Sequence, residues 1–200
     1  MKKVLLGFSL TLLLIFAPVA YSAAPSDTVK GHVNKVLEVL RDPTLKAEPG
    51  KKVRKEKIRS ISEEMFDFTE LSKRSLAQNW KRFNPGQQEE FIKLFKSILE
   101  TAYVDKIAAY TDEKVIFGGE NTLSEKAVEI PTTIVTKTSE IPIHYRLIEE
   151  QGRWKVYDVV IEGVSLVNNY RTQFREILAN KTPEALLDIL RKKVGDARAT

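Results

Sequence analysis

The sequence predicts an α+β fold, with helices packed on one face of a twisted antiparallel sheet of about four strands. Three observations predict it: apolar residues recur at helical spacing up to residue 110, they alternate with polar residues between 114 and 162, and helical spacing then returns. Helices grouped before and after a meander of strands are typical of α+β proteins. The 200 residues contain no internal repeat or Pro/Gly-rich linker, so we expect one domain.

Two helices are expected at the start of this domain. Ser26 or Asp27 can cap the first helix, and Asp42-Pro43 ends it, because a residue before proline disfavours the helical conformation. The second helix covers about residues 49–65 and is charged on most faces. Its inward-facing side chains are expected to be Val53, Ile58 and Ile61.

The next two helices carry capping signals. Asp67 can cap a short helix in which Glu70 is placed to complete a capping box. Asn84 can cap a long helix, and Pro85 occupies its first position, where the missing N–H costs nothing. Because the apolar stripe of the long helix is wide and aromatic, it needs a large apolar partner surface. The stripe consists of Phe91, Leu94, Phe95, Ile98, Leu99, Ala102, Tyr103, Ile107 and Tyr110.

The middle of the chain has the period of strands. Four strands are expected, at residues 114–117, 127–138, 141–149 and 153–162. Pro131 predicts an edge strand or a bulge, since proline cannot donate a hydrogen bond to its neighbour. Gln151-Gly152 is expected to form a hairpin turn between the last two strands. Helices at about 164–180 and 183–194 follow, the second capped by Thr182.

Residues 1–22 are expected to form a cleaved signal peptide. Lys2 and Lys3 give a positive start, an apolar run follows, and Ala20-Tyr21-Ser22 offers small side chains at a cleavage site. The apolar run is short for a membrane span, and an uncleaved anchor is the alternative interpretation. Residues 23–200 are expected to be a single exported domain without disulfides, because the sequence contains no Cys.

The charge balance argues against a nucleic-acid binder. Without Lys2 and Lys3, 30 of the 32 Lys and Arg residues remain against 27 Asp and Glu, which leaves a net charge of +3. The basic residues are interleaved with acids, as in residues 51–64, and this is typical of a solvated helix face. No nucleic-acid partner is therefore expected.

Reacting groups for an enzyme are scarce. The sequence has no Cys, and its two histidines, His32 and His144, lack a metal-binding spacing, so neither a metal site nor another cofactor is expected. Ser165 follows Gly163-Val164 as in a nucleophile elbow, but the closing glycine is missing, and Ser165 is interpreted as a helix cap. We expect no enzymatic activity; a periplasmic hydrolase on the same scaffold is the alternative.

Two carboxylates near the end of the last strand have different expected roles. Asp158 and Glu162 are separated by four residues of strand, roughly 13 Å, which is far for paired acid–base work. Asp158 stands among apolar neighbours, so if it is buried it needs a partner such as Arg171 or a backbone N–H.

The remaining feature is apolar surface that several elements direct toward the interior. Such a surface fills an ordinary core or lines a binding cavity, and periodicity does not distinguish these two. The candidate lining residues are Trp80, Phe91, Phe95, Leu99, Tyr103, Ile143, Tyr145, Leu147, Val156, Val160, Val167, Tyr170 and Phe174.

An ordered set of short motifs runs along nearly all of residues 23–200. In the most informative stretch, a strand ending in Tyr157-Asp158 runs into Glu162-Gly163-Val164-Ser165. The other motifs, in chain order, are Phe66-Asp67, Leu71, Trp80, Pro85, Gln87-Gln88, Phe91, Trp154, Tyr170-Arg171 and Gln173-Phe174. In this set the chain resembles the MlaC family, the periplasmic phospholipid carriers of Gram-negative bacteria.

The resemblance implies a soluble shuttle in the periplasm. Such a protein holds phospholipid acyl chains in a dry cavity between sheet and helices. Its expected partners are an outer-membrane lipoprotein–porin complex and an inner-membrane ABC lipid transporter complex. The candidate lining residues then become candidate lipid-binding residues. The alternatives are a carrier of another lipid, such as a hopanoid, and a non-catalytic periplasmic adaptor with a filled core.

Overall fold

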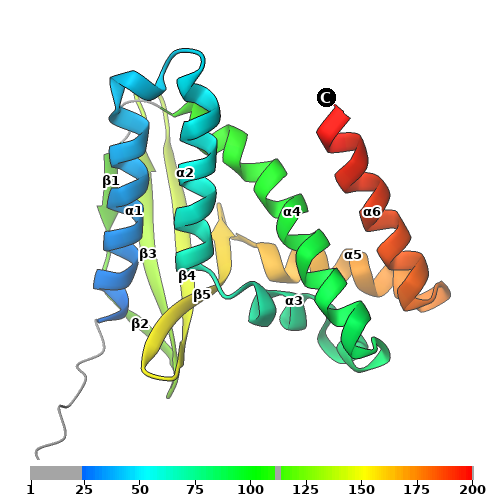
Figure 1. The fold of residues 1–200 in the computed structure, drawn as a ribbon. Coiled ribbons are helices and arrows are strands. Elements are labelled where there is room, and N and C mark those ends of the chain that lie inside the picture. The colour runs from blue at the N-terminus through cyan, green and yellow to red at the C-terminus, as the bar shows by residue number, and fades with distance from the viewer. Residues whose placement is uncertain (1–23, 111–113, 200) are drawn as a thin grey trace, which may run out of the picture.

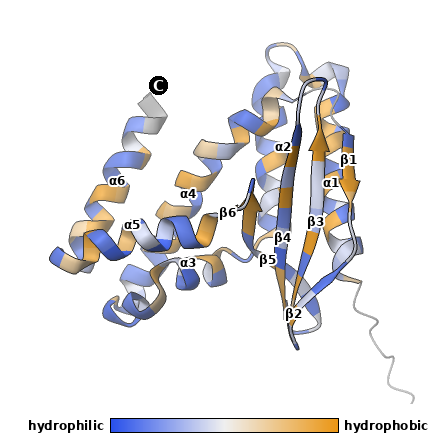
Figure 2. Cartoon of the chain, turned by 180° about the vertical axis from the view of Figure 1, so that it is seen from behind, coloured by the Kyte–Doolittle hydropathy of each residue, from blue (hydrophilic) through white to orange (hydrophobic). Residues whose placement is uncertain are grey.

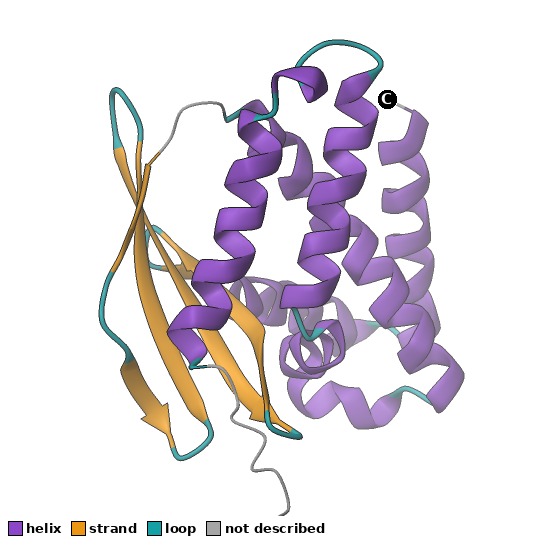
Figure 3. Ribbon diagram, turned by 60° about the vertical axis from the view of Figure 1, so that its left-hand side comes forward, coloured by secondary structure: helices purple, strands orange, loops and turns teal. Residues whose placement is uncertain are grey.

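Helices stand on one side of an open antiparallel sheet, as the sequence predicts (Figure 3). The structure, a computed structural model, describes residues 24–110 and 114–199, so the expected signal peptide lies outside the described residues. The helices are α1 (Pro25–Arg41), α2 (Gly50–Met65), α3 (Phe68–Leu76), α4 (Pro85–Ala109), α5 (Leu166–Asn180) and α6 (Pro183–Ala199). The strands are β1 (Lys114–Phe117), β2 (Asn121–Ser124), β3 (Ala127–Val135), β4 (Glu140–Glu150), β5 (Arg153–Ile161) and β6 (Val164–Ser165).

The sheet has more strands than the sequence predicts. Its order is β1-β3-β4-β5-β6, and β2 pairs with β3 off this path, which gives six strands in the described part of the chain instead of about four. β2 escapes prediction because it is hydrophilic and exposed along its length (Figure 2). β6 escapes prediction because it is only two residues long.

Pro131 lies in an interior strand, which corrects the expectation of an edge strand or a bulge. On one side of β3, β1 pairs with residues 132–135 and β2 pairs with residues 127–129. Pro131 therefore stands opposite the gap between these two strands. Its carbonyl oxygen accepts a hydrogen bond of 2.8 Å from the N–H of Gly118 on this side. Proline has no N–H to donate, and at this position the neighbouring strand is interrupted, so no ladder hydrogen bond is lost.

α4 begins as the sequence predicts. Asn84 Oδ1 accepts a hydrogen bond of 2.9 Å from the N–H of Gln87, and Gln87 Oε1 accepts one of 3.2 Å from the N–H of Asn84. Pro85 occupies the first turn. This reciprocal cap satisfies two backbone donors, which fixes where the longest helix of the described chain starts.

The cap of α3 is only half of the expected capping box. Asp67 accepts a hydrogen bond of 2.8 Å from the N–H of Glu70, as predicted. The N–H of Asp67, however, donates to the carbonyl oxygen of Val156 at 2.9 Å, and the Glu70 carboxylate pairs with Arg74 at 2.7 Å. The start of α3 is therefore tied to the edge of β5.

The first two helices differ in detail from the prediction. α1 begins at Pro25 and has no side-chain cap, so neither Ser26 nor Asp27 caps it. Proline at the first helical position is preorganised for the start of a helix. On α2, Val53 is 43% exposed instead of facing inward.

The apolar interior divides into three clusters of buried side chains. The first, here called the aromatic cluster, joins α3, α4, α5 and α6; the second lies between α1 and the sheet; the third joins α1, α2 and the C-terminal half of α4 (Figure 1). In the aromatic cluster, the ring centroid of Phe174 is 5.3 Å from that of Phe91 and 5.2 Å from that of Phe95, and the centroids of Phe91 and Phe95 are 5.5 Å apart. These rings are in mutual contact, so this part of the interior is filled.

Candidate functional site

A cavity lies where the three clusters meet, between the sheet and the helices. Its volume is about 360 Å³, at the lower end of the range of about 300–1,000 Å³ typical of small-molecule sites. Helices α1, α2, α3 and α4, the first residue of α5 and four strands contribute to its wall. The wall thus combines segments from α1, at the start of the described chain, to the first residue of α5.

The sheet contributes three rows of apolar side chains to this wall. Paired residues on neighbouring antiparallel strands point to the same face, so each row crosses from strand to strand. The rows are Tyr145–Val159, Ile143–Ile161 and Val115–Ile134–Ile141. Apart from Tyr145, all of these positions carry β-branched side chains, which fit a pleated surface and are apolar.

A β-bulge decides which residues of β5 face the cavity. Tyr157 has no partner on β4, because the register shifts by one residue beside it. Simple alternation from Val156 would direct Val160 to the cavity side. The extra residue reverses the alternation, so Val159 and Ile161 line the wall and Val160 lies on the opposite face of the strand.

The opposite wall is built mainly by α1 and α2, which sequence reasoning did not include among the candidates. Their apolar stripes were visible at helical spacing, but a stripe of this kind looks the same in a filled core. The main lining residues on these helices are Val33, Leu37, Leu40, Ile58, Ile61 and Met65.

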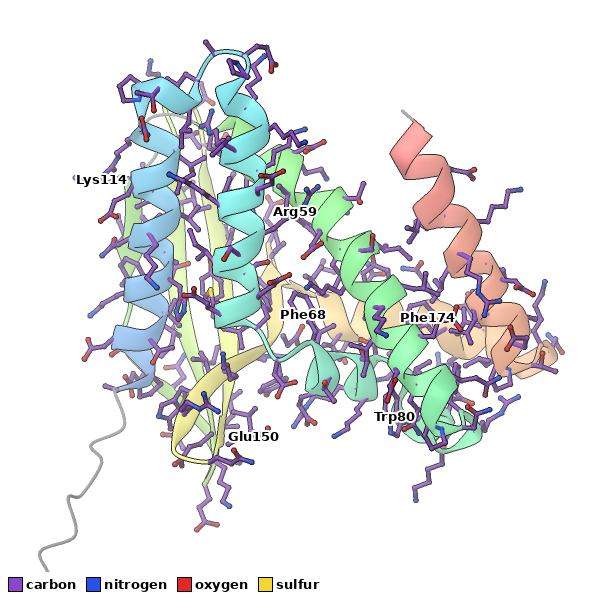
Figure 4. All side chains as sticks on the ribbon, in the orientation of Figure 1. Arg59, Phe68, Trp80, Lys114, Glu150 and Phe174 are labelled. Carbon is purple, nitrogen blue, oxygen red and sulfur yellow. The ribbon has the colours of Figure 1, made fainter. Side chains whose placement is uncertain are left out.

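The candidate lining residues fall into two groups. Leu99, Tyr103, Ile143 and Tyr145 face the cavity. The others lie outside its wall. Phe91, Phe95, Val167 and Phe174 are buried in the aromatic cluster, and Trp80 (Figure 4) and Tyr170 pack against it. Leu147 and Val156 are buried beneath α1. For the residues of α4 the reason is its length: the first half of its 25 residues packs on α6 and α5, and only the second half reaches the cavity.

Two charged side chains stand in the wall among the described residues that line it. Lys106 is exposed, and its Nζ lies 5.7 Å from the centroid of the Tyr103 ring, so it marks a side where the cavity meets solvent. Glu100 is more enclosed, and burial raises the pKa of its carboxyl group. Burial also raises the pKa of Tyr145 to about 12, so its hydroxyl is neutral at neutral pH.

Asp158 fixes the start of α5 beside the cavity. Its buried carboxylate accepts hydrogen bonds from Ser165 Oγ at 2.7 Å and from the N–H of Val167 at 3.0 Å, and Arg146 Nη1 lies 3.3 Å away. The backbone N–H partner was predicted from the sequence. Leu166, which lines the cavity, lies between the two donors on α5 and is held in place by them.

Two other polar side chains near α5 were also considered from the sequence. Arg171 does not reach Asp158, because its Nε donates to the carbonyl oxygen of Arg74 at 2.9 Å. Ser165 is the helix cap that the sequence predicts, since its Oγ accepts a hydrogen bond of 3.0 Å from the N–H of Asn168. Both contacts attach α5 to its neighbours.

One of the two histidines considered from the sequence, His144, lies away from the cavity. His144 Nδ1 is 3.4 Å from Glu129 Oε1 on the outer face of the sheet. In the part of the chain that the structure describes, no three His, Cys, Asp or Glu side chains are grouped to hold a metal ion. No helix among the described residues has the length and hydrophobicity needed to cross a membrane.

Curated relatives share part of this sequence. Over 99 residues the chain is 28% identical to the intermembrane phospholipid transport system binding protein MlaC of Haemophilus influenzae, and this match covers 47% of the chain but only 46% of that protein. Over 156 residues it is 22% identical to the toluene tolerance protein ttg2D of Pseudomonas putida, covering 77% of the chain and 73% of that protein.

The fold is also similar to a solved structure. A phospholipid-binding protein from Ralstonia solanacearum, solved in complex with a phospholipid, superimposes with a TM-score of 0.79 at 24% identity. The superposition covers 88% of this chain and 99% of that one. Residues 30–192, well over half of the chain, match the family model described as MlaC protein. The order of the motifs, the cavity between sheet and helices and this match agree: the chain belongs to the MlaC family.

Proposed function

We propose that this chain binds the acyl chains of a phospholipid in the cavity and carries the lipid through the periplasm as a soluble protein. The observation that carries the proposal is the wall itself, in which only Glu100 and Lys106 are charged among the described lining residues. The named function of the Haemophilus influenzae relative and the phospholipid in the Ralstonia solanacearum structure point to the same ligand class.

The energetics of lipid transfer explain why such a cavity is useful. Each CH₂ group moved from an apolar environment into water costs about 0.8 kcal/mol, so roughly 30 groups in a two-chain lipid give a barrier on the order of 20–25 kcal/mol. A carrier removes this barrier by offering an apolar wall in place of water. Its affinity has to be comparable to that of a bilayer, because tighter binding would prevent release.

The proposed partners follow from the energetics and from the family. The sequence carries no nucleotide-binding motif, so the proposed carrier equilibrates lipid between membranes and leaves the energy source to a partner. We propose an outer-membrane lipoprotein–porin complex and an inner-membrane ABC lipid transporter complex as these partners. Residues 1–22 would direct export, and residues 23–200 would form the carrier as a single non-catalytic domain.

The test is to identify what the protein carries. The full chain, including its own N-terminal segment, is expressed in a bacterium and purified from the periplasm without detergent. Its mass is then measured by mass spectrometry under native and denaturing conditions. We expect a mass difference equal to one phospholipid and the same lipid in an organic extract. A lipid-free protein that also takes up no phospholipid from vesicles would favour the filled-core adaptor, and a bound hopanoid would favour a carrier of that lipid.

A further inference from the structure

The Glu100 carboxylate in the cavity wall has an unsatisfied oxygen. Glu100 Oε1 is shielded from solvent, and no donor among the described residues lies within hydrogen-bond distance of it. The side chain is 16% exposed and belongs to the lining of the cavity. A buried acceptor without a partner costs free energy in the folded protein, so a ligand that supplies a donor here gains affinity.

Two basic side chains, Lys96 and Arg59, act on the Glu100 carboxylate, and neither donates a hydrogen bond to it. Lys96 Nζ is 3.8 Å from Oε1, beyond a hydrogen bond, and it forms its closer ion pair with Glu63. Ser62, which also lines the cavity, donates its hydroxyl hydrogen to the carbonyl oxygen of Arg59 at 2.7 Å. With no donor at Oε1 from the described side chains, an occupant of the cavity that reaches this carboxylate can supply one.

We propose that Glu100 accepts a hydrogen bond from a hydroxyl group of the bound lipid and so selects hydroxyl-bearing lipids. This inference rests on the proposed function, because it assigns a specificity-determining residue to the same cavity. The hydroxyl comes either from the head group or from an acyl chain, and the chemistry at Glu100 is the same in both cases. A wall that is otherwise almost entirely apolar makes one such bond effective in discrimination.

The charges around Glu100 favour a neutral donor over an ammonium group. Lys96 Nζ is 3.8 Å from Glu100 Oε1, and a second cation at this oxygen would lie close to it. Arg59 also acts on this carboxylate and lies on the side of α2 that faces α4 (Figure 4). Since both basic side chains repel a cation, a hydroxyl satisfies Glu100 without the electrostatic cost that an ammonium group would bring.

The experiment compares lipids with and without hydroxyl groups, and adds a lipid with an ammonium group. The full chain is equilibrated with vesicles of equimolar phosphatidylglycerol and phosphatidylmethanol, which have the same charge and the same acyl chains. A second vesicle contains phosphatidylmethanol with stearoyl or hydroxystearoyl chains, and a third contains phosphatidylethanolamine and phosphatidylmethanol. The bound ratio is measured by mass spectrometry for the natural protein, for Glu100→Met, and for Glu89→Met, an exposed position on the same helix.

We expect about a tenfold preference for the hydroxyl-bearing lipid in the first or the second vesicle, as a hydrogen bond to a charged group provides. Which vesicle shows it identifies the head group or the chain as the source. The preference should vanish in Glu100→Met and persist in Glu89→Met. Equal binding of all lipids, a preference that survives Glu100→Met, or a preference for ethanolamine that Glu100→Met abolishes would overturn the inference alone. Binding of no lipid would overturn the proposed function together with it.

Discussion

The N–H of Val167, the second residue of α5, donates a 3.0 Å hydrogen bond to the carboxylate of Asp158 in β5. Asp158 is 2% exposed, so this bond is made where water does not compete. It joins the sheet to the helix that follows it, at the place where Leu166 enters the cavity wall. The junction between sheet and helix is thereby set by a buried charge.

Replacing Asp158 by Ala is expected to destabilise the protein by about 3 kcal/mol, because Val167 and Ser165 lose their acceptor in a buried site. Urea unfolding followed by circular dichroism measures the loss. Ser165→Ala is the matched comparison, and removing that cap should cost only about 1 kcal/mol. Similar losses in the two variants would contradict the central position of Asp158.

Val115 and Ile116 are neighbours on β1 with opposite surroundings, and they allow a controlled test of the cavity. Val115 lines the wall, whereas Ile116 is 54% exposed. We expect Val115→Glu to remove bound lipid and Ile116→Glu to leave it in place, because a carboxylate in an apolar cavity is costly to desolvate. The lipid content of the purified variants, measured by extraction, checks this, and equal retention would argue against the cavity as the lipid site.

Glu100 is expected to lower the stability of the protein near neutral pH. Its pKa in the folded protein is raised by burial above the ordinary value of 4.5, so folding favours the protonated form. This stabilising contribution is fully present below the ordinary pKa and is lost as the pH rises through the raised pKa. Glu100→Gln should therefore raise the Tm at pH 7 and change it little at pH 4.

Thermal unfolding at the two pH values provides the measurement for Glu100→Gln. Glu89→Gln, at an exposed position of the same helix, should leave the Tm almost unchanged at both values. A lower Tm for Glu100→Gln at pH 7 would mean that the ionised carboxylate is stabilised in the fold, contrary to the direction of its pKa.

Phe174 and Ile134 are expected to differ sharply in their contribution to stability. Phe174 is buried among the rings of the aromatic cluster, and Phe174→Ala should cost about 3–5 kcal/mol, as for other buried aromatic residues. Ile134 faces the cavity and is only partly buried, so Ile134→Ala should cost about 1 kcal/mol. Denaturant midpoints test this order, and the reverse order would place the filled core on the sheet side.

The sequence was sufficient to predict the elements whose signals are local. The cap at Asn84 and the hairpin turn at Gln151-Gly152 depend on neighbouring residues alone, and the structure confirms both. β2 and β6 carry no local signal, because the first is short, mostly polar and exposed along its length and the second has only two residues. Pro131 misled the prediction because the gap that accommodates it lies between two other strands.

The cavity was less predictable than the fold. Leu99, Tyr103, Ile143 and Tyr145 were placed on the correct faces by their period, but a period does not say which part of a long stripe is filled. Val160 was misplaced because a bulge at Tyr157 is a matter of pairing and not of composition. Whether the lining residues bind lipid stays a prediction.

Separate placement of the aromatic cluster and the cavity wall has a consequence for how this scaffold can change. The aromatic cluster is a filled part of the interior held among α3, α4, α5 and α6, while the shape of the cavity is set by mainly aliphatic rows on the sheet and on α1 and α2. Exchanges among Ile, Val and Leu in those rows alter the available volume and leave the rings in place. Ligand preference can therefore diverge between descendants of one ancestor while the scaffold stays foldable.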